Sequence, residues 1–166
     1  MKTMRLFPLE LKRLLQSRLT WLMMALAVLS PALGLVLYKP ATSTTMLSMY
    51  LANPAIAGGV AGAILFGLLT IFELDRACRS RVDILNDAVV SPLTTALTRL
   101  LALLMAAVLT VGLTMLVWLP ISAGLIGAVF TGVNFLLAYL LLMGLALPLG
   151  ILAAAAVYQF TRRADL

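Results

Sequence analysis

The residues of this chain that could do polar chemistry are concentrated in one stretch, residues 72–87, which reads FELDRACRSRVDILND. Seven of its sixteen residues are charged, whereas charged residues make up 11% of the whole chain. The charges recur at helical spacings, since Glu73 lies three residues before Arg76 and Asp75 lies four before Arg79. Opposite charges at these spacings meet on one face of a helix. The stretch therefore predicts a helix whose charges compensate one another.

Catalytic chemistry is not indicated by the sequence. The chain has no histidine, which is the commonest general base and metal ligand. Its single cysteine, Cys78, excludes an intrachain disulfide and suggests no metal site. A GxxxxGK[ST] phosphate-binding loop is also absent, so any ATP hydrolysis would come from a partner. We expect no catalytic residues, no cofactor and no bound metal in this chain.

The elements that must position the charged stretch are membrane helices. Hydrophobic residues make up 63% of the 166 residues, and the mean hydropathy is +1.12. A soluble fold of this size cannot bury so much apolar surface. A helix of about 20 apolar residues spans the hydrocarbon core of a bilayer. We therefore expect an all-α transmembrane bundle, one domain over residues 1–166, with four spans at 19–38, 55–72, 100–119 and 134–158.

Two features inside these spans lead to expectations of their own. Pro120 is expected to end the third span, which leaves an apolar, glycine-rich linker that lies in the interface or dips back into the membrane. In the second span, Gly58 and Gly62 form a GxxxG pair, and small residues at this spacing let helices approach closely. We expect this pair to serve helix packing within the chain.

The orientation of the spans follows from the positions of lysine and arginine. The N-terminal segment holds five of them, the first connector one, the middle segment four, the last connector none and the C-terminus two. Because positive loops stay in the cytoplasm, this alternation predicts a multi-pass protein of the cell membrane with both termini cytoplasmic. Residues 73–99 are then a charged cytoplasmic loop. The same rule accounts for the net charge of +6 without nucleic-acid binding.

The N-terminal segment, residues 1–18, is expected to form an interfacial elbow helix before the first span. Pro8 and Glu10 favour a helix start, and Phe7, Leu11 and Leu14 share one face. A basic amphipathic helix of this kind lies flat on the membrane surface. Two other interpretations remain open, namely a simple extension of the first span and a secretory signal peptide, although no clear cleavage site follows.

The second half of the charged loop predicts a docking surface for another protein. Residues 81–91, RVDILNDAVVS, interleave aliphatic and acidic residues as a short amphipathic helix does, and that helix must end before Pro92. A solvated loop whose arginines only fix the topology is the alternative. That alternative does not explain the four acids of residues 72–87, since acids contribute little to orientation.

The layout of these segments resembles the N-terminal part of an ABC-2 type permease, the membrane subunit of an ABC exporter. The resemblance rests on the basic N-terminal segment LELKRLLQSRLTW and on ILNDAVVSPLTTALTRLLA, residues 84–102, in which Arg99 is the basic residue that opens the third span. In that family a leucine-rich helix after the second span is followed by a PVS-like turn. Such permeases normally have six spans, so the four spans here depart from the pattern.

The resemblance implies a partner and a set of docking residues. Permeases of this type receive a separate cytoplasmic ATP-binding subunit, and each works with a second permease copy or a companion membrane chain. The helix that would dock in the ATP-binding subunit, and couple its closure to the spans, carries over to Arg79, Arg81, Val82, Asp83, Ile84, Leu85 and Asp87.

The expected cargo of such a transporter is hydrophobic or amphipathic, because residues 100–161 contain no charged group. Two other functions remain open. One is an ABC membrane component of cytochrome c maturation, which has a similar N-terminal helix and charged loop. The other is a small membrane scaffold or regulatory protein without a transport path.

Overall fold

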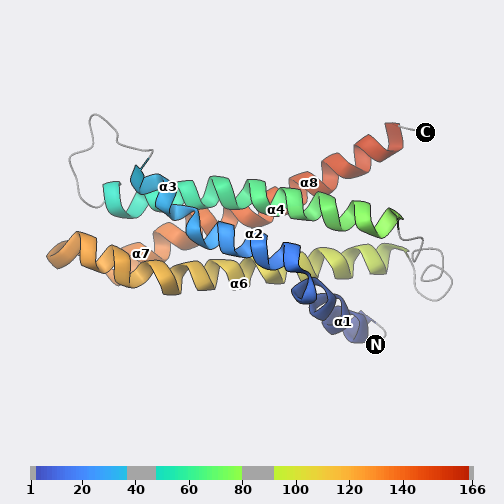
Figure 1. Cartoon of the computed structure of the whole chain (residues 1–166), viewed down its shortest axis with the longest axis horizontal. Coiled ribbons are helices and arrows are strands. Elements are labelled where there is room, and N and C mark those ends of the chain that lie inside the picture. Colours follow the sequence, from blue (N-terminus) through green and yellow to red (C-terminus); the bar gives the residue numbers. More distant parts are fainter. Residues whose placement is uncertain (1–2, 37–47, 80–91, 165–166) are drawn as a thin grey trace.

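The structure is a computed structural model that describes residues 3–36, 48–79 and 92–164 (Figure 1). These residues are almost entirely helical, and no strand occurs among them. The all-α class predicted from the sequence is therefore confirmed. Four helical segments are long and apolar enough to cross a membrane: Arg18–Val36, Tyr50–Arg76, Leu93–Val129 and Gly132–Thr161.

The helices of the first half are α1 (Thr3–Gln16), α2 (Arg18–Leu29), α3 (Pro31–Val36), the short π-helix η1 (Ser48–Ala52) and α4 (Asn53–Arg79). Those of the second half are α6 (Pro92–Ile126), the 3-10 turn η2 (Gly127–Val129), α7 (Gly132–Ala138), the π-helix η3 (Tyr139–Met143) and α8 (Gly144–Ala164). The first span combines α2 and α3, and the fourth combines α7, η3 and α8.

The four spans run antiparallel along one long axis. In the view of Figure 1, α2 crosses between α4 and α6, and α3 overlaps α4. The end of α4, the start of α6, α1 and the end of α8 all lie at one end of this bundle. The hairpin between the third and fourth spans lies at the opposite end. The sequence predicts an even number of crossings. In agreement with this number, α1 and the last turns of α8 lie at the same end of the bundle.

The third span is longer than predicted, and the expected stop at Pro120 is wrong. α6 continues through Pro120 to Ile126, and only η2 and a turn separate it from α7. A proline removes one backbone N–H, and its neighbours in a membrane bundle can compensate for that loss. Gly127, with φ of 65°, adopts the left-handed conformation that ends the helix and starts the hairpin. The predicted linker is therefore mostly helix.

The charged loop predicted at 73–99 is also shorter than expected, because helices occupy both of its ends. α4 continues seven residues past the predicted end of the second span, to Arg79. α6 begins at Pro92, where a fixed φ suits the first turn of a helix and the missing N–H is not needed. The segment between these two helices, 80–91, lies outside the described residues.

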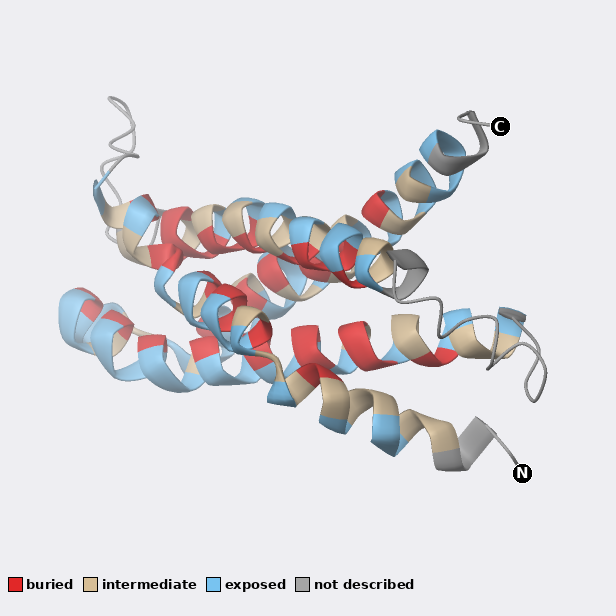
Figure 2. Ribbon diagram, turned by 45° about the vertical axis from the view of Figure 1, so that its right-hand side comes forward, coloured by how far each residue is buried: buried red, intermediate tan, exposed pale blue. Residues whose placement is uncertain are grey.

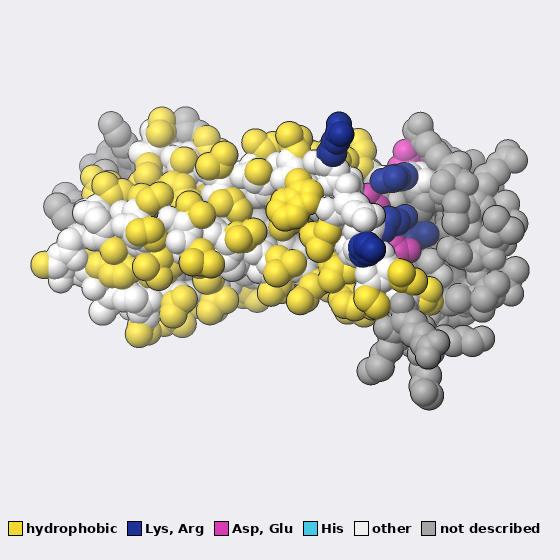
Figure 3. All heavy atoms as spheres, turned by 60° about the horizontal axis from the view of Figure 1, so that its bottom comes forward, with side chains coloured by type: hydrophobic (Ala, Val, Ile, Leu, Met, Phe, Trp, Pro, Cys, Tyr) yellow, Lys and Arg dark blue, Asp and Glu magenta, His cyan; other side chains and the backbone are white. Residues whose placement is uncertain are grey.

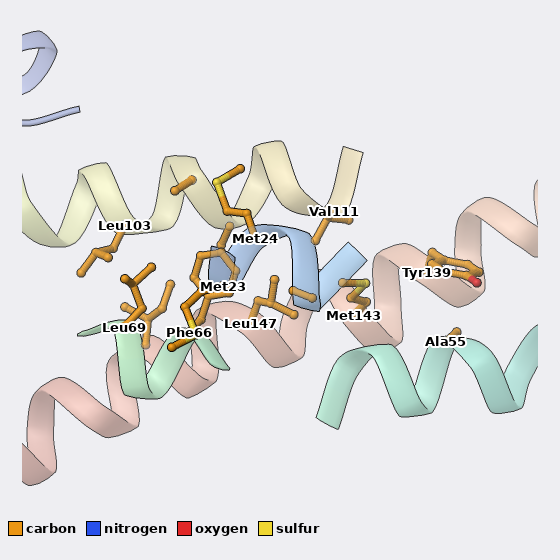
Figure 4. Close-up of a cluster of buried hydrophobic side chains, with 14 of the residues drawn as sticks. Met23, Met24, Ala55, Phe66, Leu69, Leu103, Val111, Tyr139, Met143 and Leu147 are labelled. Carbon is orange, nitrogen blue, oxygen red and sulfur yellow. The ribbon is translucent and has the colours of Figure 1, made fainter. Parts of the chain in front are cut away.

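The core lies along the inner faces of all four spans (Figures 2 and 4). Met24 from α2, Phe66 from α4, Leu103 from α6 and Leu147 from α8 are all buried in it. The outward faces carry exposed leucine, isoleucine and valine, as expected where lipid replaces water. The last turns of α8 extend away from the other helices and are mostly exposed (Figure 2).

Candidate functional site

The charged side chains whose positions are described gather at one end of the molecule (Figure 3). This end brings together α1, the last turns of α4 and the first turns of α6. Of the predicted docking residues, Arg79 is the last residue of α4, and its side chain lies outside the described set. The other six, Arg81, Val82, Asp83, Ile84, Leu85 and Asp87, also lie outside the described residues.

Glu73 is the most buried charged group of this end, with 8% of its side chain exposed. The predicted pair with Arg76, three residues along α4, is confirmed, with Arg76 Nη1 lying 3.8 Å from Glu73 Oε1. The shorter contact comes from another helix. Arg13 of α1 donates a hydrogen bond from Nη2 to Glu73 Oε2 at 2.9 Å. A charge-assisted bond to a desolvated carboxylate is stronger than one between neutral groups.

A second carboxylate, Glu10, extends this contact to the third span. Its Oε2 lies 2.9 Å from Arg13 Nε, and its Oε1 lies 3.7 Å from Nε of Arg99 on α6. The Glu10–Arg13 contact is an ion pair rather than an aligned hydrogen bond, because neither of its two atoms has a hydrogen-bond partner among the described residues. Five groups on three helices thus form one network, which we call the ionic cluster: Glu10, Arg13, Glu73, Arg76 and Arg99.

Apolar packing beside the ionic cluster holds α1 against the bundle. Leu14 is 3% exposed and touches the same small cavity as Glu10 and Arg99. Ser17 has an extended backbone (φ −75°, ψ 125°), so α1 and α2 are separate helices rather than one long span. The indole of Trp21 donates to the carbonyl of Leu15 at 2.6 Å, which satisfies one of the last carbonyls of α1. The junction is therefore a defined elbow.

The glycines of α4 lie where this helix meets its neighbours most closely. Gly58 is buried, and a Cβ there would lie 3.0 Å from the Pro31 ring. Gly62 is buried as well, and a Cβ there would lie 2.6 Å from a methyl of Leu147 on α8. The pair singled out in the sequence therefore lies in the packed face of α4, within this chain.

The hydroxyl groups at membrane depth are mostly bonded to their own helices. Thr70, Thr110 and Thr114 each donate to the carbonyl four residues earlier, at 2.7 to 2.8 Å. Ser30 donates to the carbonyl of Ala27, three residues earlier, at 2.7 Å and directly before Pro31. Threonines bonded in this manner have their donor satisfied and are not aimed at a ligand. Among the described residues, no group of three or more acidic, cysteine or histidine side chains could hold a metal ion.

A groove of about 410 Å³ lies on the outer surface between α6 and the fourth span. Gly112 and Met115 line it from α6, and Gly144 and Pro148 line it from α8. Since proline has no N–H, the carbonyl of Gly144 lacks the usual donor four residues ahead. The groove is otherwise apolar, so it suits a hydrophobic molecule better than an ion.

The features that sequence analysis missed are the contacts between distant segments. Arg13 and Glu73 are 60 residues apart, and the sequence marks Arg99 as a topology signal and as the basic residue that opens the third span, but not as a partner of Glu10. Helical spacing reveals pairs within one helix and carries no information about pairs between helices.

Comparisons with known proteins add no relative. No protein-family model matches the chain, and neither a curated protein nor a solved structure matches it.

Proposed function

We propose that this chain is the membrane-spanning permease subunit of an ABC-2 type transporter. It moves a hydrophobic or amphipathic substrate with energy from ATP hydrolysed by a separate cytoplasmic subunit. The observation that carries this proposal is the ionic cluster, which joins α1 to the two helix ends that flank residues 80–91. Those residues include Ile84 and Leu85, the apolar pair that we propose docks in the partner.

The ionic cluster explains how docking at 80–91 could act on the spans. A force on this segment reaches α4 through Arg79 and α6 through Pro92, the residues at which the two helices end and begin. The contacts of Arg13 and Arg99 hold both helices to α1, so the three helix ends move together. A docking event would then displace two spans and the elbow as a unit, instead of distorting one loop.

The chemistry of the spans supports a hydrophobic substrate. All eight charged side chains whose burial is described lie at the end that holds the ionic cluster. The groove between α6 and α8 offers glycines and apolar side chains to a ligand. A coupled carrier of ions or protons normally keeps a carboxylate at membrane depth. Residues 100–161, which include most of the third and fourth spans, contain none.

The proposal is tested by recovering the partner. The full chain carries an N-terminal tag, is extracted from its native host in mild detergent, and its bound proteins are identified by mass spectrometry. We expect an ATP-binding subunit in stoichiometric amount. The double variant Ile84→Asp/Leu85→Asp should lose that subunit, because two charges would have to be desolvated in an apolar docking groove.

A matched control separates docking from a general effect of charge. Thr44→Asp/Thr45→Asp adds the same two charges to the first connector, outside residues 81–91, and should retain the partner. All three proteins should insert in the membrane in equal amounts. Recovery of no ATP-binding subunit with the unaltered chain would refute the transporter function and favour a scaffold. Recovery with Ile84→Asp/Leu85→Asp at the normal level would refute the docking assignment alone.

A further inference from the structure

An open apolar slot of about 590 Å³ lies beside the contact between α1 and α6. Phe7 of α1 lines it, and along α6 its wall extends from Leu97 to Val108. The eleven steps along the helix from Leu97 to Val108 cover about 16 Å at 1.5 Å per residue. The slot therefore follows the axis of a membrane span.

The lining of the slot is suited to an alkyl chain. Leu97, Leu101 and Val108 are each exposed by half or more, so the slot opens on the lipid-facing surface. The one hydroxyl in its wall belongs to Thr98, and it donates to the carbonyls of Thr94 and Thr95 on its own helix at 2.9 Å. A molecule in the slot would thus gain apolar contacts without hydrogen bonds, as a fatty acyl chain does.

One end of the slot lies at the charged end of the bundle. Leu97 and Thr98 belong to the second turn of α6, and the described charged side chains gather at this end of the molecule. The charged side chains with described burial are five cations and three carboxylates, and all lie at this end. Both carboxylates of the ionic cluster are already paired with arginines. The excess positive charge favours an anion at the level of lipid headgroups.

We propose that this slot is a binding site for one anionic glycerophospholipid. An acyl chain lies along α6 between Phe7 and Val108, and the phosphate lies at the membrane surface near the positive end. Lys12 and Arg18, both exposed at this end, supply further attraction for the headgroup. This site does not depend on the transporter function, because it requires no partner subunit and no substrate.

The proposal is tested by native mass spectrometry of the full chain, delipidated in detergent and titrated with phosphatidylglycerol or with phosphatidylcholine of identical acyl chains. We expect the first adduct to form at an at least fivefold lower concentration of phosphatidylglycerol, since each nearby Lys or Arg contributes about that factor. The variant Lys12→Gln/Arg18→Gln should reduce this preference. Leu101→Trp, which fills the slot, should weaken the first adduct about tenfold or more.

The matched control is Leu116→Trp, because Leu116 is another exposed leucine of α6 and lies outside the slot. It should bind phosphatidylglycerol as the unaltered chain does. Equal binding of the two lipids by the unaltered chain would overturn the anionic preference. Equal first-adduct binding by Leu101→Trp and Leu116→Trp would overturn the assignment of the slot, because both proteins then bind lipid elsewhere.

Discussion

The contact between Arg13 and Glu73 leads to a quantitative prediction for stability. Two unit charges about 4 Å apart attract by about 4 kcal/mol at an effective dielectric constant of about 20. Desolvation opposes this attraction, and it is most severe for Glu73, whose side chain is 8% exposed. Arg13 is 39% exposed, so solvent screens part of the interaction. We therefore expect a net coupling between the two side chains of about 2 kcal/mol.

The coupling is measured with a double-mutant cycle. Arg13→Gln, Glu73→Gln and the double variant are unfolded reversibly with SDS in mixed micelles, and their free energies of unfolding are compared with that of the unaltered chain. Arg13→Gln should be destabilised by about 2 to 3 kcal/mol, since it leaves the buried carboxylate with Arg76 alone, at 3.8 Å. Glu73→Gln should destabilise the protein less, because Arg13 keeps its ion pair with Glu10 at 2.9 Å.

Lys12→Gln is the control for this cycle, because Lys12 is an exposed cation of the same helix. Its free energy of unfolding should stay within about 0.5 kcal/mol of that of the unaltered chain. A coupling energy below about 0.5 kcal/mol between Arg13 and Glu73 would refute the reasoning. It would mean that the pair is solvated in the membrane-embedded protein and that α1 is held by its apolar contacts alone.

Two further predictions concern packing between the spans. Gly150→Ala should lower the free energy of unfolding by about 1 to 3 kcal/mol in the same SDS assay, because the new methyl would lie 2.5 Å from the backbone oxygen of Ala63. Gly112→Ala is the control and should be neutral, because a methyl there would have no atom within 4 Å. Trp118→Phe should cost about 1 to 3 kcal/mol, since the indole of this buried α6 residue donates to the carbonyl of Val28, a part-buried residue, at 2.8 Å. Trp21→Phe should cost less, because Trp21 is exposed and water can replace its bond to Leu15.

The sequence was sufficient to predict the helical class and the four apolar spans, because membrane spans depend on local composition and length. It was not sufficient to place their ends. Pro120 breaks a soluble helix more reliably than a membrane helix, so the third span was cut short in the prediction by seven residues. The Glu73–Arg76 pair could be predicted since both residues share one helix, while Arg13 could not be assigned to Glu73 by any spacing rule.

The ionic cluster has a consequence for α1 that stability alone does not capture. A basic amphipathic helix in the interface can rotate about its own axis by small amounts, because lipid headgroups accept its cations in many positions. A buried carboxylate accepts a cation in few positions, since Glu73 would keep only Arg76, at 3.8 Å, if Arg13 turned away. The pair therefore fixes which face of α1 meets α4, and it also fixes the register of Leu14 in the core. In Arg13→Gln, loss of this specificity should appear as a broader distribution of α1 orientations, even in molecules that remain folded.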